Sequence, residues 1–229
     1  MSLPNIVAID GPAGSGKSTI SYRLAERYDY LFVDTGIFYR TLTLVALRHG
    51  VPLDDQTALT ELAEATTIDI IPAPRDPHHK SHVFANELNV TDYIRTSEVE
   101  AAVSTVSAIP GVRRALLEKQ RSVAKQGMVI MAGRDIGTVV LPNADIKLYV
   151  DASLEERTQR RYNQCIERGE DVDYEEIKAA LARRDKIDSE RTVSPLKIPD
   201  DAIYILTDGM TIEETVDEIG QHLEMWQPA

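Results

Sequence analysis

The sequence contains a single cysteine, Cys165, so an intramolecular disulfide and a cysteine-rich zinc site are both excluded. Cys165 lies in an ordinary helical pattern, and we assign it no role. No apolar run is long enough to cross a bilayer, and the start of the chain shows no secretory signal. We therefore expect a cytoplasmic protein that does not contact membranes.

Basic residues are in the minority, with 25 Lys and Arg against 37 Asp and Glu and a formal net charge of −12. This balance argues against nucleic acid or an anionic membrane as the main partner. However, 17 of the 25 basic residues are arginines, and several of them are grouped. Because guanidinium groups bind phosphate through two parallel hydrogen bonds, this grouping suggests small phosphorylated ligands.

A phosphate-binding loop lies near the start of the chain. The pattern G-x-x-x-x-G-K-[ST] is fitted by Gly11, Pro12, Ala13, Gly14, Ser15, Gly16, Lys17, Ser18 and Thr19. An apolar strand is predicted directly before this loop and an amphipathic helix directly after it. Backbone N–H groups of such a loop point at an anion, and the helix adds its positive end. Lys17 can reach the β- and γ-phosphates of a nucleotide, and the Ser18 hydroxyl can hold Mg²⁺ as the cofactor of ATP.

Strands and helices alternate through most of the chain, and 43% of its 229 residues are hydrophobic. Apolar runs predict five core strands, at 6–9, 31–34, 128–132, 146–150 and 202–206. This alternation predicts a three-layer α/β fold of the P-loop type with a five-stranded, mostly parallel sheet. Ligands of such sheets bind beyond the carboxyl ends of the strands.

One segment breaks the alternation. Residues 68–96 contain short β-like runs around a proline-rich polar loop, which predicts a small β-containing insert domain. Three histidines, His78, His79 and His82, lie in or beside this loop. With no second group of ligands nearby, they are better explained as solvated hairpin residues than as a metal site. The expected organisation is a core at 1–67, 97–152 and 171–229, the insert at 68–96, and a short arginine-rich segment at 153–170.

Arginines and aspartates lie together at one strand end and along one predicted helix. Arg134 and Asp135 directly follow a strand, where ligands are expected, so we favour a functional role for this pair. Arg184, Asp188 and Arg191 have the spacing i, i+4, i+7, which places them on one face of a helix. The alternative for such a face is a solvated surface of Glu–Arg pairs.

A second arginine group lies on the preceding helix. It comprises Arg157, Arg160, Arg161 and Arg168. For Arg160 and Arg168 we favour a solvated surface, since Glu156 is placed to pair with Arg160 one turn away.

Four motifs, in order along nearly the whole chain, resemble those of the bacterial cytidylate kinases. They are the loop at 11–19, Asp34-Thr35-Gly36 with Tyr39-Arg40, the run Gly133-Arg134-Asp135-Ile136-Gly137-Thr138-Val139-Val140, and Arg184, Asp188 and Arg191 followed by Ser194-Pro195-Leu196. Many families share the first motif. The Gly-Arg-Asp run and the late Arg/Asp helix are far more discriminating.

The resemblance implies transfer of the γ-phosphoryl group of ATP to CMP and dCMP by a monomeric enzyme. CMP-binding positions are matched by Thr35, Tyr39, Arg40, Ser104, Arg113, Arg134, Asp135, Arg184, Asp188 and Arg191. Arg40 and Arg134 match clamps on the acceptor phosphate, and Arg157 and Arg161 match arginines of a lid over the triphosphate. Together with Lys17 they form the expected catalytic set. The resemblance also implies that the insert binds the monophosphate and that the arginine-rich segment is the lid.

Three of these positions read the cytosine edge in the family: Ser104, Arg113 and Asp135. A carboxylate accepts from the cytosine amino group, while Arg and Ser donate to the ring nitrogen and the carbonyl. Uracil carries a carbonyl in place of the amino group, so Asp135 would disfavour UMP. No general base is needed, because the acceptor phosphate is already an anionic nucleophile. We expect catalysis by alignment and charge neutralisation, with closure of the insert and the lid to exclude water.

The chain departs from the family pattern in two places. Family loops often carry serine where this chain has Ala13, and the loss of that hydroxyl weakens the expected contact with the acceptor phosphate. The proline-rich loop of the insert is not a family pattern.

Three alternatives remain open. One is a kinase of the same fold with UMP, AMP or a small hydroxylated metabolite as acceptor. Another is a non-catalytic module that senses ATP, which would have no need of a second anion site. The last is a nucleic-acid-binding arginine helix, which conflicts with the net charge.

Overall fold

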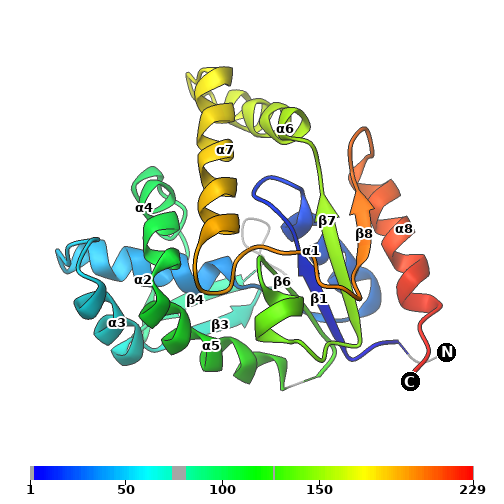
Figure 1. The fold of residues 1–229 in the computed structure, drawn as a ribbon, viewed down its shortest axis with the longest axis horizontal. Coiled ribbons are helices and arrows are strands. Elements are labelled where there is room, and N and C mark those ends of the chain that lie inside the picture. Colours follow the sequence, from blue (N-terminus) through cyan, green and yellow to red (C-terminus); the bar gives the residue numbers. More distant parts are fainter. Residues whose placement is uncertain (1–2, 74–80, 126, 229) are drawn as a thin grey trace. The chain divides into compact units, whose positions relative to one another are not determined.

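The computed structural model describes residues 3–73, 81–125 and 127–228 of the chain. The chain divides into two compact units. Met1–Val33 and Gly127–Ala229 form the larger unit, and Asp34–Gln126 forms the smaller unit. Figure 1 labels the helices and strands of both.

The larger unit is built on a five-stranded sheet. Its strands are β1 (Ile6–Asp10), β2 (Leu31–Asp34), β6 (Val129–Gly133), β7 (Ile146–Asp151) and β8 (Ile203–Leu206). They lie in the order β2-β6-β1-β7-β8. β1 pairs in parallel with β6 and with β7, and β7 pairs in parallel with β8. Consecutive residues of β1 and β6 are buried, which explains why both read as continuous apolar runs in the sequence.

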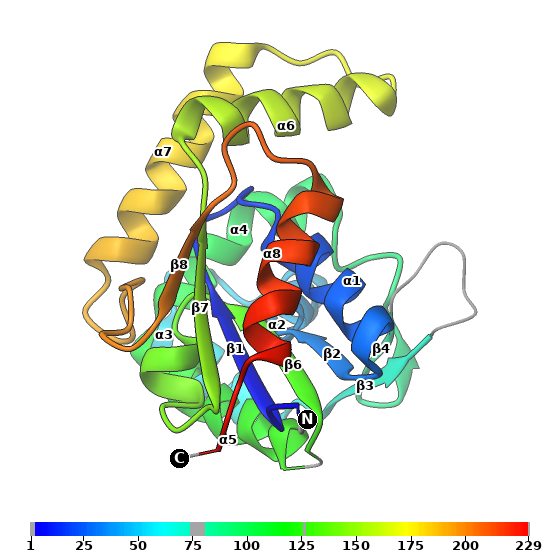
Figure 2. The ribbon, with the colours of Figure 1, turned by 90° about the vertical axis from the view of Figure 1, so that its right-hand side faces the viewer.

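The described residues of the larger unit also form four α-helices and one π-helix. They are α1 (Lys17–Tyr28), η1 (Ile136–Val140), α6 (Leu154–Glu167), α7 (Tyr174–Glu190) and α8 (Ile212–Glu224). Figure 2 shows α1 and α8 side by side on one face of the sheet. Leu24 of α1 and Ile219 of α8 are fully buried there against Ile9 and Leu148. α8 begins with a complete capping box between Thr211 and Glu214, as their spacing in the sequence predicts.

The smaller unit packs helices against a short antiparallel sheet. Its elements are α2 (Gly36–Arg48), α3 (Gln56–Ala65), β3 (Ile68–Pro72), β4 (Ser81–Ala85), β5 (Leu88–Asn89), α4 (Ser97–Ala108) and α5 (Pro110–Ala124). The sheet order is β3-β4-β5, and Val83 of β4 packs in one core cluster with Val45 of α2 and Val99 of α4. Gly111 allows α5 to approach α3, since a Cβ at this position would lie 2.0 Å from the Thr60 hydroxyl oxygen.

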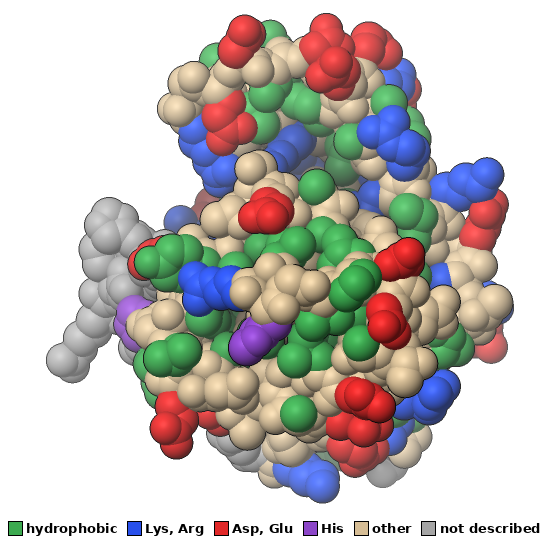
Figure 3. All heavy atoms as spheres, turned by 90° about the vertical axis from the view of Figure 1, so that its left-hand side faces the viewer, with side chains coloured by type: hydrophobic (Ala, Val, Ile, Leu, Met, Phe, Trp, Pro, Cys, Tyr) green, Lys and Arg blue, Asp and Glu red, His purple; other side chains and the backbone are tan. Residues whose placement is uncertain are grey.

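The surface of the smaller unit is mixed in character. Figure 3 faces the side on which Figure 1 draws α2, α3 and α4, and it shows hydrophobic side chains interspersed with charged ones. Leu88 is 67% exposed, and Ile71 and Tyr93 are each about half exposed. Such scattered apolar side chains are normal for a protein surface and carry no argument for a partner.

The expected α/β fold of the P-loop type, with a five-stranded, mostly parallel sheet and a small β-containing insert, is confirmed, and the sheet of the insert is antiparallel. The π-helix η1 was not expected. His78 and His79 lie outside the described residues, and His82 is part of β4. Among the described residues, no group of three or more His, Cys, Asp and Glu side chains is arranged to hold a metal ion. None of the helices in this part of the chain is long and apolar enough to cross a membrane.

Candidate active site

The loop between β1 and α1 has a glycine-dependent backbone. Gly11, Gly14 and Gly16 have φ values of +152°, +80° and +87°, in the region that side chains other than glycine rarely adopt. A Cβ on Gly11 would lie 2.0 Å from the Val150 carbonyl oxygen, so the loop also passes too close to β7 for a larger residue. The conformation that exposes backbone N–H groups to an anion therefore requires these glycines.

Two polar side chains of this loop fit a phosphate ligand. The Lys17 ammonium donates to the Pro12 carbonyl at 2.7 Å, which folds the side chain back over the loop. The Ser15 hydroxyl is fully buried and has no hydrogen-bond partner within the described residues. A phosphate oxygen in the loop would accept from both groups. Ser18 lies in the first turn of α1, and its hydroxyl is an oxygen ligand of the kind that Mg²⁺ prefers beside nucleotide phosphates.

The segment that follows β6 starts beside this loop. The parallel register pairs Asp10, the last residue of β1, with Gly133, the last residue of β6. The phosphate-binding loop and the segment that begins with Arg134 therefore leave neighbouring strands at the same edge of the sheet. Asp135 precedes the π-helix η1, which continues the chain away from the strand end.

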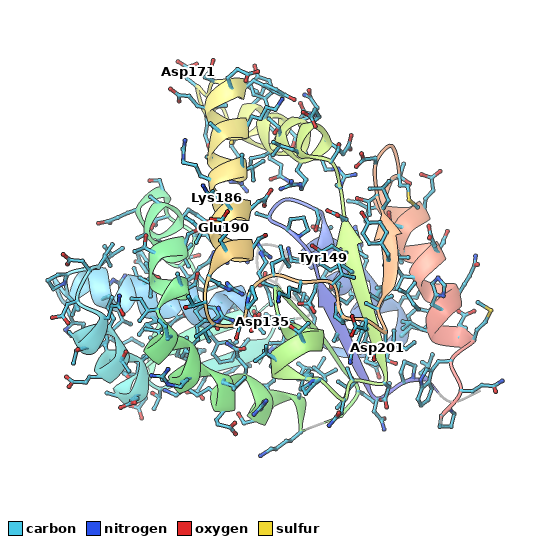
Figure 4. All side chains as sticks on the ribbon, viewed as in Figure 1. Asp135, Tyr149, Asp171, Lys186, Glu190 and Asp201 are labelled. Atoms are coloured by element: carbon cyan, nitrogen blue, oxygen red, sulfur yellow. The ribbon has the colours of Figure 1, made fainter. Side chains whose placement is uncertain are left out.

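Four charged side chains of this segment, of the end of α7 and of the residue after α7 form one network, which we call the arginine–aspartate cluster. It consists of Arg134, Asp135, Asp188 and Arg191. Arg134 Nε donates to Asp188 Oδ2 at 2.8 Å. The two terminal nitrogens of Arg191 lie 3.5 Å from Asp188 Oδ1 and 3.5 Å from Asp135 Oδ1. In Figure 4, Asp135 lies near the end of α7 that carries Glu190.

The charge state of Asp188 follows from these neighbours. Burial raises the pKa of Asp188, but the positive charges of Arg134, Arg191 and Arg184 outweigh it and hold the pKa below its ordinary value. The carboxylate is therefore ionised at neutral pH. Its own backbone carbonyl accepts from Leu196 N–H at 2.7 Å, and the Ser194 carbonyl accepts from Arg191 Nε at 2.6 Å, which ties the chain after α7 to the cluster.

The arginines of α6 differ in their surroundings. Arg157 is buried, and it donates to the carbonyls of Ala152 and Ala13 and pairs with Asp185 at 2.8 Å. Through Ala13 it holds the phosphate-binding loop. Arg161 is half-buried on the same helix, and Arg168 lies just after it, 61% exposed beside Glu170. The solvated surface predicted for Arg168 is confirmed.

Arg160 has more contacts than its sequence context indicates. The predicted pair with Glu156 is present at 2.9 Å. Arg160 also donates to the Thr207 carbonyl at 2.7 Å and to the Thr207 hydroxyl at 3.0 Å, and its Nη1 lies 3.4 Å from the Ser15 carbonyl. This side chain therefore joins α6 to the end of β8 and to the phosphate-binding loop.

The smaller unit holds its own group of the residues predicted to bind CMP. Arg40 of α2 donates to Glu100 of α4 through Nε at 2.8 Å and through Nη2 at 3.3 Å. Arg113 is buried with its guanidinium 5.1 Å from the centre of the Tyr39 ring, and its Nη1 donates to the Ser107 carbonyl at 3.1 Å.

Two further predicted residues complete this group. Thr35 is buried at the start of α2, and Ser104 is half-buried in α4. The Ser104 carbonyl accepts from the Ser107 hydroxyl. Four of the five residues lie in α2, α4 or α5 of the smaller unit, and Thr35 is the N-cap of α2.

Comparison with known proteins gives the same family as the motifs. Residues 7–225 match the family described as cytidylate kinase. The chain is 49% identical over 213 residues to the cytidylate kinase of Geobacillus sp. (strain WCH70), with 93% of each chain covered. It is 44% identical over 218 residues to that of Bacillus subtilis (strain 168), with 95% of this chain and 96% of the relative covered. The chain belongs to the cytidylate kinase family.

Among solved structures, an uncharacterised protein from Eubacterium ventriosum ATCC 27560 has a similar fold. The TM-score is 0.52 and the identity 15%, with 96% of this chain and 99% of that chain covered. At this identity the likeness concerns the fold alone.

One buried carboxylate beside the phosphate-binding loop, that of Asp10, was not predicted from the sequence of this cytidylate kinase family member. Asp10 is fully buried at the end of β1, and its two carboxylate oxygens accept the N–H groups of Ile136 and Gly137, each at 2.7 Å. The available signal was a carboxylate at the end of an otherwise apolar, buried strand, where charged residues are rare.

Proposed function

We propose that this chain transfers the γ-phosphoryl group of ATP to CMP and dCMP, giving the nucleoside diphosphate and ADP. Membership of the cytidylate kinase family supports the reaction class and the acceptor. The observation that carries the proposal is the register of β1 with β6, because it sets the phosphate-binding loop beside Arg134 and Asp135. A donor triphosphate on the first and an acceptor monophosphate on the second would have their reacting groups close together.

The phosphate-binding loop is the proposed donor site. Lys17 binds the β- and γ-phosphates, the loop amides bind the remaining oxygens, and Ser18 is the protein ligand of the nucleotide's Mg²⁺. When bound, Mg²⁺ neutralises charge on the phosphate oxygens. Arg157 and Arg161 of α6 are proposed to face the triphosphate. Arg157 also fixes the loop through the Ala13 carbonyl, so its proposed role includes holding the loop in shape.

The acceptor is proposed to bind through its phosphate and through its base. Arg40 and Arg134 bind the acceptor phosphate. Ser104, Arg113 and Asp135 read cytosine, since a carboxylate there accepts from the amino group and loses its partner when the base is uracil.

The rest of the acceptor site is assigned to five further residues. Thr35 and Tyr39 are proposed to line the acceptor site, and Arg184 and Asp188 to lie beside the sugar. Arg191 supports Asp188 and Asp135, from which it lies 3.5 Å in both cases.

Catalysis in this proposal needs no general base. The acceptor phosphate is an anion, so the protein contributes by alignment and by positive charge around the transferred group. The arginines are already paired with carboxylates, so an incoming phosphate exchanges one anionic partner for another. This exchange limits the desolvation cost of binding.

The test is a panel of acceptors. ADP release from ATP and Mg²⁺ is measured with CMP, dCMP, UMP and AMP supplied separately. We expect turnover with CMP and dCMP and at least about tenfold lower kcat/KM with UMP, because the buried Asp135 carboxylate would face a carbonyl oxygen in place of the cytosine amino group. Equal or faster turnover with UMP or AMP would overturn the base assignment, and ATP binding without turnover on any acceptor would overturn the reaction.

A further inference from the structure

Asp10 is a buried carboxylate to which none of the proposed roles applies. It ends β1 after four apolar residues and is fully inaccessible to solvent. Burying a charge is costly unless strong hydrogen bonds compensate it. Both oxygens are used: Oδ1 accepts from Ile136 N–H and Oδ2 accepts from Gly137 N–H, each at 2.7 Å. These amides belong to the first two residues of the π-helix η1.

The two bonds fix the backbone of the residue that precedes them. The Asp135 carbonyl accepts from Val139 N–H at 2.9 Å and from Val140 N–H at 3.0 Å. Asp135 is thus held on its carbonyl side by the π-helix, while Asp10 holds the two amides that follow. The direction of the Asp135 carboxylate, toward Arg191, depends on this backbone being fixed.

We propose that Asp10 is a positioning residue for Asp135, and that its two bonds to the Ile136 and Gly137 amides set the cytosine preference of the enzyme. The inference rests on the proposed function, in which Asp135 reads the base. Asp10 does not touch the acceptor in this arrangement. It acts through the backbone of the segment that carries the reading carboxylate.

A purely structural role explains this carboxylate less well. β1 and β6 are already joined through their backbones in the register that pairs Asp10 with Gly133, so the sheet does not require the side chain. The charged groups that face Asp10 are Asp135 and Lys17. Burial and the like charge of Asp135 raise the pKa of Asp10 to about 6, against the effect of the two amides and Lys17. The folded protein therefore retains a charge that does not stabilise it, as functional sites commonly do.

The test uses Asp10→Asn, with Asp145→Asn as the matched control. Asp145 lies at the opposite end of β1, and its Oδ2 accepts from Asn5 N–H at 2.8 Å and from Ile6 N–H at 2.9 Å, the two hydrogen bonds that its side chain accepts from the described residues. The single amide oxygen of an asparagine can replace that one atom. Asp10 uses both oxygens, so its asparagine variant must place an amide NH₂ against one of the two N–H donors. Both variants lose one negative charge, but only Asp10→Asn loses the arrangement in which two oxygens accept from two amides.

Asp10→Asn should raise KM for CMP about tenfold and lower the preference for CMP over UMP in kcat/KM about tenfold, while KM for ATP changes less than about twofold. Asp145→Asn should leave all of these constants at the parent values. A variant of Asp10 that keeps the parent preference for CMP would overturn the inference. An equal fall in kcat/KM for CMP, UMP and ATP would overturn it too, because a purely structural role predicts that result.

Failure of the proposed function gives a different result. If the parent enzyme does not prefer CMP, or if Asp135→Asn keeps the preference, the base assignment falls and the role of Asp10 falls with it. If Asp10→Asn does not fold, amide hydrogen exchange of the parent protein decides. Saturating CMP should slow exchange at Ile136 and Gly137 more than saturating ATP does, because binding and the two bonds support each other. Equal exchange with either nucleotide would overturn the inference.

Discussion

The phosphate-binding loop and the arginine–aspartate cluster lie at the same edge of one sheet but carry their chemistry differently. The loop is a contiguous segment whose proposed binding groups are mostly backbone amides, so its function depends on its backbone shape. The cluster is made of side chains from two distant segments, and its two arginines and two aspartates balance in formal charge. Substitution in the loop is therefore limited by steric clashes, whereas substitution in the cluster is limited by the balance of charge.

Gly11→Ala should have the largest effect, because it attacks the shape of the loop. Its φ of +152° and a Cβ only 2.0 Å from the Val150 carbonyl oxygen make alanine both strained and overpacked. We expect a loss of about 3 kcal/mol or more in the free energy of unfolding, and kcat/KM for ATP at least about 1000-fold lower. The measurements are thermal unfolding and ADP release.

Gly50→Ala is the control for this change. Gly50 also has a positive φ, of +65°, but a Cβ there meets nothing within 4 Å. Alanine at this position should cost about 1 kcal/mol and leave turnover unchanged. If the two alanine variants behaved alike, close packing against β7 would not be what restricts the loop.

Arg134→Ala should have the next largest effect, because it breaks the charge balance of the cluster. Asp188 loses its hydrogen bond at 2.8 Å, and the acceptor phosphate loses its proposed clamp. We expect kcat/KM for CMP to fall about 100-fold with little change in KM for ATP. Arg27→Ala, which removes an exposed ion pair with Asp217, should leave both constants unchanged. No loss of CMP turnover in Arg134→Ala relative to the parent would contradict the clamp assignment.

The titration of Asp10 makes the free energy of unfolding depend on pH. Asp10 directly precedes the phosphate-binding loop, and its side chain binds the segment that carries Asp135. Its pKa is about 6 in the folded chain against an ordinary value of 3.8. Between these values the folded chain keeps a proton that the unfolded chain releases, so the contribution of Asp10 to stability falls as the pH rises from about 4 to about 6.

Asp10→Asn removes this titration. The free energy of unfolding of the parent relative to that of the variant should therefore decrease by up to roughly 3 kcal/mol over the same interval. Urea unfolding of both proteins at a series of pH values measures this difference. A difference that stays constant, or that grows as the pH rises, would show that Asp10 is ionised throughout.

Ala13→Ser should have the smallest effect. It introduces the hydroxyl that family loops often carry. The loop would then bind the acceptor phosphate through a side chain as well, as the arginine–aspartate cluster is proposed to do. We expect KM for CMP to fall about threefold, the value of one modest hydrogen bond, while KM for ATP stays the same. Initial rates at varied CMP measure the change, and an unchanged KM would mean that this hydroxyl does not reach the acceptor.

The elements that depend on residues close together in the chain were predicted from the sequence. The apolar run before Gly11 and the helical spacing after it correctly gave β1, the loop and α1, because glycine conformation and hydrophobic periodicity act over a few residues. The short strands of the smaller unit were also predicted, but not their antiparallel pairing. The π-helix was not, because Ile136–Val140 is short, rich in β-branched residues and without helical periodicity.

Contacts between distant segments were beyond such rules. Asp10 binds amides 126 and 127 residues away, and Arg160 binds Thr207 47 residues away. No pattern along the chain indicates which carboxylate meets which amide. For the cluster, the spacing of Arg184, Asp188 and Arg191 predicted a shared helix face, but α7 ends at Glu190 and Arg191 follows it in extended backbone. Only the family resemblance connected these residues with Arg134.

Cys165 gives the chain a practical property. It is the only thiol, and it is buried in α6, where burial and a hydrogen bond with Glu170 raise its pKa. Little thiolate forms at neutral pH, so a maleimide would react first with a cysteine introduced on the surface. Glu118 in the smaller unit and Asp217 in the larger unit are exposed positions for such a pair. A spin-labelled or dye-labelled enzyme can therefore be made with the native thiol in place, and the distance between the labels can be measured by spectroscopy with and without nucleotide.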